Sequence, residues 1–390
     1  MVQDNHRLGT LVETSAGGER VRAYVPAPLP PDPPLELGPL MGIYERAIAA
    51  VGRLDGVATI LPSTPLFLYM YVRKEALLSS QIEGTQSSLS DLLLFENDEA
   101  PTVGIDDVTE VSNYVAAIEH GVRRMKEGFP LSLRLIREMH AILLKSGRGA
   151  TRQPGAFRRS QNWIGGTRPG NALFVPPPPN HLDGCLDALE RFLHSESPSL
   201  PPLIRAGLAH VQFETIHPFL DGNGRLGRLL ITLILCEAGI LREPILYLSL
   251  FLKARRDEYY RLLQEVRQEG TWETWLEFFL TGVAETAEQA TATARDLIAL
   301  FETHRGTISG LGRAAATALR VHDLMQARPI VTIQTVSDNL GISFPTASTA
   351  LENLTTVGVL RETTGRQRGR IYAYSDYLSL LDKGTDPLPG

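Results

Sequence analysis

Residues 217–228 have the sequence His-Pro-Phe-Leu-Asp-Gly-Asn-Gly-Arg-Leu-Gly-Arg, which brings together residue types that could bind phosphate and activate an attacking group. The turn Gly222-Asn223-Gly224 can adopt backbone angles closed to most residues and point successive N–H groups at one anion. An apolar run follows from Leu226, so we expect a helix to begin here and to add the positive end of its dipole. The segment is therefore predicted to hold phosphate groups.

The side chains of this segment extend the same chemistry. Arg225 and Arg228 are three residues apart and share a helix face, so their guanidinium groups suit a polyphosphate better than a single phosphate. Asp221 supplies the carboxylate oxygen that Mg²⁺ takes at nucleotide sites. His217 is the group that can accept a proton near neutral pH. Each of these residues alone is more often structural, and it is the combination of eight specified positions out of twelve that makes the prediction specific.

At these residues the chain resembles the Fic family, whose motif is His-x-Phe-x-Asp/Glu-Gly-Asn-Gly-Arg-x-x-Arg, and the similarity extends from about residue 40 to 300. The resemblance implies a protein adenylyltransferase that moves AMP from ATP to a Ser, Thr or Tyr hydroxyl of a target protein and releases pyrophosphate. It makes His217 the catalytic base, Asp221 the ligand of Mg²⁺ on the α- and β-phosphates, and Arg228 the partner of the γ-phosphate. Related phosphotransferase toxins carry Lys at the position of Gly224, which favours nucleotide transfer here.

The resemblance also implies a set of nucleotide-binding residues. In this set Phe219 is a packing anchor, and Gln212 on the preceding helix could equally form a hydrogen bond within the core. The set consists of Gln212, His217, Pro218, Phe219, Leu220, Asp221, Gly222, Asn223, Gly224, Arg225 and Arg228.

A second match lies upstream, in Ser79-x-x-x-Glu83-Gly84. It resembles the inhibitory helix motif of Fic proteins that carry an N-terminal brake, in which the glutamate binds the second motif arginine, here Arg228. The spacing places Ser79 and Glu83 on one helix face. Autoinhibition is the predicted result, and the alternative is a solvated glutamate at a helix end. A secondary hypothesis is that Glu83 also positions a water molecule for removing AMP from modified targets.

Residues 161–175 contain two short apolar segments on either side of a Gly/Pro/Asn turn cluster, which predicts a small hairpin or flap. Trp163, Ile164 and Phe174 are its apolar side chains. We expect this flap to dock the backbone of the target protein by strand addition.

Composition limits the wider function classes. The 390 residues include 38 Lys+Arg and 44 Asp+Glu, a net charge of −6, and 43% are hydrophobic, which is typical of a soluble globular protein. The two cysteines, Cys185 and Cys236, are far apart, so a disulfide framework and a cysteine-rich zinc site are excluded. No apolar leader or membrane-length run is visible, and we expect a cytoplasmic protein that does not bind membranes.

The predicted fold is mainly α: a Fic helical core with a small β-hairpin flap, followed by a winged helix-turn-helix domain. Seven prolines between residues 21 and 40 predict an extended arm. Apolar spacing predicts a helix that ends near Glu83, a capping box at Ser88 and Asp91, and helices over 107–146, over 181–216 and from Gly224 to about Phe301. The predicted division is a proline-rich arm over 1–40, a helical region with the inhibitory helix over 41–105, a Fic catalytic core over 106–305 and a winged-helix domain over 320–380.

The C-terminal segment has its own pattern. Helix, turn and helix over 335–357 precede a hairpin with a cationic tip, where Arg366, Arg368 and Arg370 are candidate DNA-binding residues. The second helix offers no Arg or Lys for bidentate reading of guanine, so DNA and a protein stay open as partners of this module.

Two functions of different classes follow. The first is an autoinhibited adenylyltransferase that uses ATP and Mg²⁺ and works as a homodimer. The alternative is a DNA-binding transcriptional regulator whose Fic domain senses a nucleotide. The presence of both His217 and Asp221 favours the first, because sensing alone requires no base.

Overall fold

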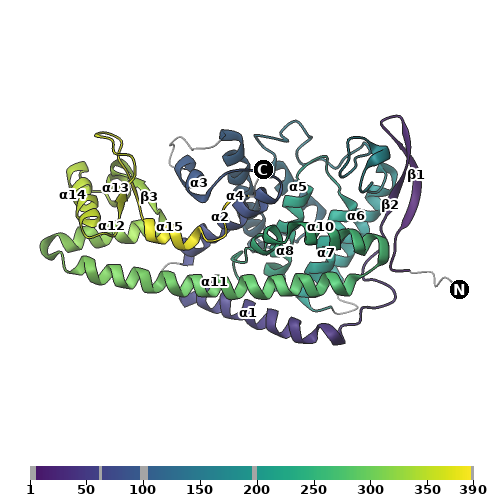
Figure 1. Ribbon diagram of the computed structural model, residues 1–390, viewed down its shortest axis with the longest axis horizontal. Coiled ribbons are helices and arrows are strands. Elements are labelled where there is room, and N and C mark those ends of the chain that lie inside the picture. The colour runs from purple at the N-terminus through teal and green to yellow at the C-terminus, as the bar shows by residue number, and fades with distance from the viewer. Residues whose placement is uncertain (1–5, 61–63, 97–103, 196–199, 388–390) are drawn as a thin grey trace.

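Helix α11 (Trp272–Ser309) runs along the length of the molecule, and the other elements are arranged on it (Figure 1). The structure is a computed structural model that describes residues 6–60, 64–96, 104–195 and 200–387. Helix α1 (Met41–Ile60) lies along α11, and both helices bury alanines at helical spacing, Ala47 and Ala50 on α1 and Ala287, Ala290 and Ala294 on α11. Such small side chains let two helix axes approach closely.

The helices of the larger body surround α7 (Pro202–Ile216) and α8 (Asn223–Glu237). Nearly every residue of α7 is buried, as expected of a helix that is apolar on all sides. Around this pair lie α2 (Thr64–Ile82), α4 (Ile105–Lys126), α5 (Leu133–Leu143), α6 (Pro179–His194), α9 (Ser249–Ala254) and α10 (Arg256–Glu269).

The predicted helical spans over 107–146 and 181–216 are each divided in two. Helix α4 ends before Gly128, which has a φ of 85°, and α5 begins after Pro130 with Ser132 as its N-cap. Helix α6 ends at His194 and α7 begins at Pro202, where proline occupies the first helical position. Glycine past a helix end and proline at a helix start are the expected chemistry of such breaks.

The predicted end of the inhibitory helix and the predicted capping box are both confirmed. Helix α2 ends at Ile82, and Gly84 follows with a φ of 100°. At the start of α3 (Leu89–Glu96), the Ser88 hydroxyl accepts a hydrogen bond from the Asp91 N–H at 3.1 Å. The Asp91 carboxylate accepts one from the Ser88 N–H at 3.0 Å. Two N–H groups at the helix start are thereby satisfied.

The N-terminal arm is not extended throughout. Strands β1 (Thr10–Ala16) and β2 (Glu19–Val25) form an antiparallel hairpin around Gly17 and Gly18, whose φ values are 56° and 83°. The extended arm was predicted from its prolines, all of which follow residue 25, and that prediction did not include this hairpin, although Gly17-Gly18 is a typical turn signal. The arm then continues to a short 3₁₀ helix, η1 (Gly38–Leu40), before α1.

The C-terminal module follows α11 through a second short 3₁₀ segment, η3 (Gly312–Ala314). Its elements are α12 (Ala315–Ala327), β3 (Ile330–Thr332), α13 (Ile333–Leu340), α14 (Phe344–Thr356), β4 (Arg361–Glu362), β5 (Ile371–Ala373) and α15 (Ser375–Leu381). The strands form an antiparallel sheet in the order β3-β5-β4. The predicted helix, turn, helix and hairpin are confirmed as elements, and strand β3 was not anticipated.

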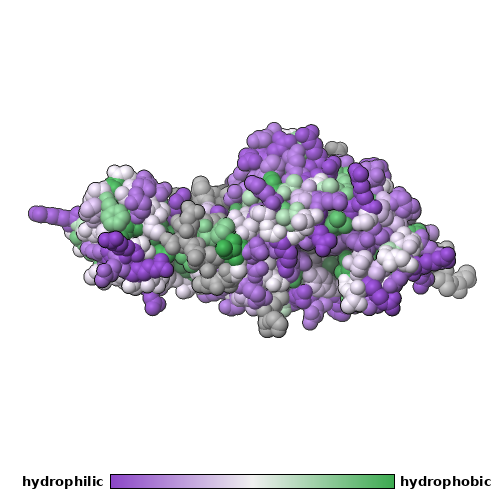
Figure 2. Space-filling view, turned by 90° about the horizontal axis from the view of Figure 1, so that it is seen from above, coloured by the Kyte–Doolittle hydropathy of each residue, from purple (hydrophilic) through white to green (hydrophobic). Residues whose placement is uncertain are grey.

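The module forms a smaller lobe beside the larger helical body, and the face seen in Figure 2 is mostly polar over both. Within the described ranges, no helix combines the length and apolar character needed to cross a bilayer.

Candidate functional site

His217 ends α7 in the left-handed backbone region, with a φ of 49° and a ψ of 60°. Such a conformation is rare for a residue with a side chain and is found where surrounding contacts enforce it. Arg158 provides these contacts. Its Nε donates to the His217 carbonyl at 2.9 Å, and its backbone N–H donates to the Pro218 carbonyl at 2.9 Å. The motif histidine is therefore held at a fixed chain reversal.

The loop between the two helices is shaped by Asn223 and Phe219. The Asn223 side-chain oxygen accepts from the Phe219 N–H at 2.8 Å, and its amide donates to the Phe219 carbonyl at 2.9 Å. The Phe219 ring is fully buried and stacks on His140 at a centroid distance of 3.6 Å. Phe219 is thus a packing anchor as expected, and the amide of Asn223 shapes the loop. Of the two neighbours of Phe219, Pro218 is buried and Leu220 is partly exposed.

Helix α8 begins at Asn223, as the motif predicted, with Gly222 as its N-cap at a φ of 76°. Asp221 lies at this helix start, where its Oδ1 accepts from the Gly222 N–H at 2.6 Å. Its side chain keeps 36% of its surface exposed, so the carboxylate can be reached by a ligand. Among the described residues no group of three or more His, Cys, Asp or Glu side chains could hold a metal by itself. One accessible carboxylate fits a Mg²⁺ ion whose other ligands are phosphate oxygens and water.

Arg225 is almost completely buried and forms an ion pair with Glu110 of α4 at 2.9 Å. Its second Nη lies 3.6 Å from Asp221 Oδ1. Glu110 also pairs with Arg148 at 3.0 Å. Burial raises the pKa of Glu110 more than Arg225 and Arg148 lower it. The guanidinium of Arg225 is thereby held beside the carboxylate that would bind the metal.

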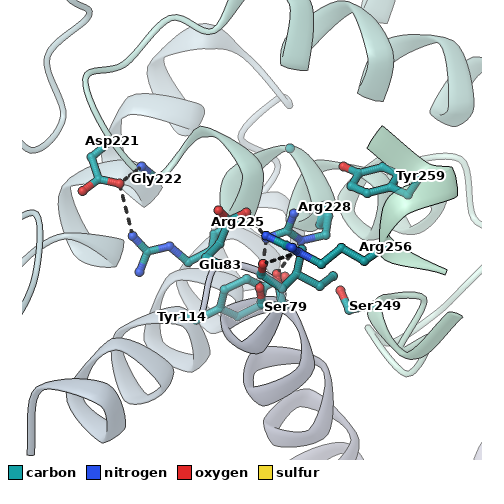
Figure 3. Close-up of polar contacts among 12 residues, drawn as sticks. Ser79, Glu83, Tyr114, Asp221, Gly222, Arg225, Arg228, Ser249, Arg256 and Tyr259 are labelled. Atoms are coloured by element: carbon teal, nitrogen blue, oxygen red, sulfur yellow. Dashed lines mark hydrogen bonds and ion pairs between the residues drawn. The ribbon is translucent and has the colours of Figure 1, made fainter. Parts of the chain in front are cut away.

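Arg228 lies one turn further along α8 and contacts the predicted inhibitory pair (Figure 3). Its Nη2 donates to Glu83 Oε1 at 2.7 Å and to the Ser79 carbonyl at 2.9 Å, and its Nε donates to the Ser79 hydroxyl at 2.9 Å. The Arg228 side chain is 1% exposed and that of Glu83 is 33% exposed. A Cβ added at Gly224 would lie 2.3 Å from Glu83 Oε1, so this glycine makes room for the glutamate.

Charge attraction dominates this contact. Burial opposes ionisation of Glu83, but the Arg228 guanidinium outweighs it and lowers the pKa of the carboxyl. Burial likewise disfavours the charged Arg228, and the Glu83 carboxylate outweighs that effect and raises the pKa of the guanidinium. Each group is therefore charged at neutral pH and satisfies the other.

Helix α2, which carries Ser79 and ends just before Glu83, is fixed to its neighbours by further polar contacts (Figure 3). The buried Glu75 carboxylate accepts from the Ser249 N–H at 3.1 Å, from the Ser249 hydroxyl at 2.5 Å and from the Tyr114 hydroxyl at 3.3 Å. Arg256 of α10 donates to the Ile82 carbonyl at 3.1 Å. These bonds place the end of α2 against the motif helix.

His217 is surrounded mainly by positive charge. Burial lowers its pKa to about 3, with additional lowering by Arg267 and Arg158, while the Glu214 carbonyl and the Glu83 carboxylate act in the opposite direction. The imidazole is thus unprotonated at neutral pH. One turn earlier on α7, burial raises the pKa of Glu214 to about 7.

The flap is present as predicted for residues 161–175. The Ile164 N–H donates to the Phe174 carbonyl at 2.8 Å, and the Phe174 N–H donates to the Ile164 carbonyl at 3.1 Å. Trp163 is 38% exposed and Phe174 is 7% exposed. The Asn162 amide donates to the Phe219 carbonyl at 3.1 Å, which ties the flap to the motif loop.

The hydrogen bond of the Gln212 side chain is made to the N-terminal arm and not to the predicted phosphate-binding turn. The side-chain amide donates to the Ala27 carbonyl at 2.8 Å and so holds the N-terminal arm against α7. The other sequence-predicted positions, from His217 to Arg228, are brought together at the junction of α7 and α8.

The arginines proposed for the hairpin tip differ in their surroundings. Arg366 and Arg368 are exposed between β4 and β5. Arg370 instead pairs with Glu352 of α14 at 3.1 Å and donates to the Ser348 hydroxyl at 3.4 Å. Arg370 is therefore engaged within the module.

Sequence reasoning missed three charged residues of the site: Glu110, Arg158 and Glu214. Two of them carry a signal in the sequence. Glu110 shares the apolar face of α4 with Tyr114 and Ile118, and Glu214 lies in a helix that is apolar on all sides. Acidic residues at such positions are rarely buried without a function or a partner. Arg158 lies in an irregular segment, where no periodicity marks it.

Comparison with known proteins identifies the region around this site. Residues 42–123 match the model described as Fic/DOC family N-terminal, and residues 130–235 match the Fic/DOC family model. Protein adenylyltransferase Fic of Drosophila yakuba is 31% identical over 185 residues, which are 47% of this chain and 34% of the relative. The chain therefore spans about a third of the length of the curated relatives it matches.

Solved structures show the same fold. A Fic family protein from Desulfovibrio desulfuricans G20 is 20% identical, with a TM-score of 0.54 over 85% of this chain and 95% of that one. Fic-1 (residues 134–508) from C. elegans is 24% identical, with a TM-score of 0.51 over 66% of this chain and 74% of that one. These two similarities concern the fold alone.

The raised pKa of Glu214 predicts a pH-dependent stability. Between the unfolded value of about 4.3 and the folded value of about 7, the folded state binds the proton more tightly, so the free energy of unfolding falls as the pH rises through this window. We expect the change in the free energy of unfolding from pH 5.5 to pH 8, measured by urea unfolding, to be more positive in Glu214→Gln than in the wild type, because the variant lacks this falling contribution. Buried histidines such as His217, whose pKa is lowered, contribute in the opposite direction and are common to both proteins. An equal difference in both proteins would contradict the assignment, and a change at the exposed Glu302, Glu302→Gln, serves as control.

Proposed function

This chain belongs to the Fic/DOC family, and we therefore propose that it is an autoinhibited protein adenylyltransferase that transfers AMP from ATP to a hydroxyl side chain of a target protein. The observation that carries the proposal is the contact of Arg228 with Glu83 at 2.7 Å beside an intact phosphate-binding turn. It combines the chemistry of nucleotide transfer with a device that blocks it.

The reaction would begin with proton transfer to His217. The neutral imidazole accepts the proton of the target hydroxyl while the hydroxyl oxygen attacks the α-phosphorus of ATP. The bond from the α-phosphorus to the bridging oxygen breaks, and pyrophosphate leaves. The negative charge of bound ATP opposes the effect of Arg158 and Arg267 on His217, so ATP is expected to raise the pKa of the base from about 3 toward neutrality.

The other residues of the turn would bind and stabilise charge. The N–H groups at the start of α8 and the Arg225 guanidinium face the region where negative charge develops on the phosphates. Asp221 would hold Mg²⁺, which when bound neutralises charge on the α- and β-phosphates. The flap would hold the target backbone so that its hydroxyl reaches His217.

The brake follows from competition for one cation. Arg228 would bind the γ-phosphate, but in this structure the Glu83 carboxylate occupies its guanidinium. ATP can then bind only after Glu83 leaves or in an arrangement that lacks the γ-phosphate contact. Removal of AMP with help from Glu83 remains a secondary hypothesis, and homodimer formation remains a prediction.

The first test is incubation with Mg²⁺ and ATP labelled on the α-phosphate, with label on protein as the measurement. We expect little label on the wild type, a rise of at least tenfold in Glu83→Gly, and loss of the label in Glu83→Gly combined with His217→Ala, because the first change frees Arg228 and the second removes the base.

The matched control is Glu127→Gly, which introduces glycine at an exposed helix end on α4. It should label like the wild type. Absence of label in all variants that still bind ATP would contradict AMP transfer, and equal label in Glu83→Gly and wild type would contradict the brake.

A second activity is favoured by the exposed Arg366 and Arg368 at the tip of the C-terminal hairpin. We propose that this module is a winged helix that binds the DNA backbone through these residues, with Arg361 nearby on β4. A chain with this activity and no AMP transfer would be a regulator that senses nucleotide.

This activity predicts a salt-dependent mobility shift of random duplex DNA. Arg366→Ala with Arg368→Ala should weaken binding and reduce the slope of log affinity against log salt by up to ~2, because each phosphate contact contributes ~0.9 to the slope. Arg313→Ala, an exposed change near η3, is the control. Unchanged affinity in the double variant would exclude the hairpin as the DNA-binding surface.

A further inference from the structure

Arg267 of α10 is a buried arginine that the mechanism above does not use. It is 9% exposed and lies between the last turn of α7 and the flap. Its Nε donates to the Thr215 hydroxyl at 3.1 Å, and its Nη2 donates to the Glu214 carbonyl at 3.2 Å. Both acceptors belong to the turn that ends at His217.

The same guanidinium faces the flap. Its central carbon lies 4.1 Å from the centre of the Phe174 ring, a distance at which a cation is attracted to an aromatic face. Phe174 in turn pairs with Ile164 across the flap. Arg267 therefore contacts both the helix that carries the base and the hairpin expected to hold the target.

Arg267 differs from the two motif arginines in its charge balance. Arg225 and Arg228 each pair with a carboxylate within 3 Å, whereas Arg267 forms no such ion pair with any described residue. Burial lowers its pKa to about 10, which leaves it charged at neutral pH. The Glu214 carboxyl is the acid whose charge stabilises this guanidinium, and burial raises the pKa of that carboxyl to about 7. A buried cation that lacks a hydrogen-bonded anion is costly, and it is expected where the charge itself has a use.

We propose that Arg267 is a positioning residue for AMP transfer, which joins the base-carrying turn of α7 to the flap. The inference rests on the proposed function, because it assigns Arg267 a part in that reaction. The Arg267 side chain contacts both the turn that carries the base and the flap that would hold the target. It would therefore keep the base and the target hydroxyl in one rigid arrangement.

The charged groups around His217 come from several elements. Arg267 from α10 and Arg158 from the segment before the flap both lower the pKa of His217, and Glu83 at the end of α2 raises it, as does the Glu214 carbonyl. Loss of the cation at 267 alone therefore shifts the balance toward a protonated histidine.

The test is an NMR titration of the full chain with isotope-labelled histidine, in which the His217 signal is assigned by its absence in His217→Gln. In Arg267→Met we expect His217 to bind its proton about tenfold more tightly than in the wild type, because a nearby positive charge is removed. Arg267→Lys keeps the charge and should titrate like the wild type. This readout does not require AMP transfer, so it stays informative if the proposed function fails.

Activity provides the second readout. In the Glu83→Gly background, Arg267→Met should move the acid side of the pH profile of self-labelling to higher pH, while Arg267→Lys keeps that profile and loses label through the weaker contact with Phe174. The control is Arg22→Met, at an exposed arginine of β2 that lines, together with Phe174 and Arg267, a cavity of about 400 Å³. A folded Arg267→Met protein with unchanged His217 titration and unchanged pH profile would reduce Arg267 to a structural residue and overturn the proposal.

A separate observation concerns residues 382–387, which leave α15 and pass along α2 (Figure 1). Their carbonyl groups accept three hydrogen-bond donors from the helical body. Lys74 Nζ donates to the Lys383 carbonyl at 3.0 Å, and Gln81 Nε2 donates to the Thr385 carbonyl at 2.8 Å. Lys253 of α9 donates to the carbonyl groups of Gly384 and Asp386 and to Gln81 Oε1 at 2.7 Å.

These contacts reach the inhibitory segment directly. Gln81 is fully buried and precedes Glu83 by two residues, and its amide also donates to the Ser87 carbonyl at 2.9 Å. Thr385 is 4% exposed, whereas the residues on either side of it are exposed, so the tail is anchored to the protein interior at Thr385. The buried Lys74 and Lys253 would lose acceptors if the tail were to leave, which gives the tail a defined position.

We infer that residues 382–387 act as a clamp on the end of α2, through which the C-terminal module stabilises the contact of Glu83 with Arg228. A ligand that shifts the module would then weaken the brake. This inference also rests on the proposed function, and it adds a route by which the brake is controlled.

Lys253→Met in the full chain tests the clamp. We expect self-labelling to rise several-fold over the wild type, and we expect no further rise in the Glu83→Gly background, where the brake is already absent. Hydrogen exchange of residues 79–85 should be faster in Lys253→Met, and this readout is independent of AMP transfer. Lys145→Met, an exposed change on the helical body, is the control. Unchanged exchange in a folded Lys253→Met protein would overturn the clamp, as would an equal rise in both backgrounds.

Discussion

The buried guanidinium of Arg228 is the group on which the state of this site depends. A charge that is 1% exposed requires an anion, and the structure supplies it from Glu83 at 2.7 Å with Ser79 filling the remaining donors. A polyphosphate would meet the same requirement. In the proposed function the two anions would compete for one position, so a single electrostatic constraint would decide between a closed site and a site ready for nucleotide.

Polar contacts hold the elements around this arginine in place. Glu75 and Arg256 hold the end of α2 in place, while Glu110 holds Arg225 beside Asp221. The chain reversal at His217 is fixed by Arg158 and by the contacts of Arg267. Most of these supports join helices that are far apart in the sequence, and the tail after α15 adds another from the C-terminal module.

The sequence predicted the parts of the site that depend on local chain chemistry. The glycines at 222 and 224, the helix start at Asn223 and the end of α2 before Gly84 all follow from backbone preferences that act over a few residues. The capping box at Ser88 and Asp91 is of the same kind. The hairpin over residues 10–25 was not predicted, although its Gly-Gly turn is a local signal for a hairpin, because the prolines that follow it indicate an extended chain.

The sequence by itself determined that a Gly-Asn-Gly turn begins a helix within residues 217–228 and that a glutamate follows the end of another helix, 145 residues away from Arg228. Only the tertiary structure decided which groups face each other across such separations. It brought Glu110 to Arg225, Arg267 to the turn of His217 and the tail to Gln81. The physical reason is that local propensity acts through neighbouring residues, whereas the partner of a buried charge is chosen by the packing of whole helices.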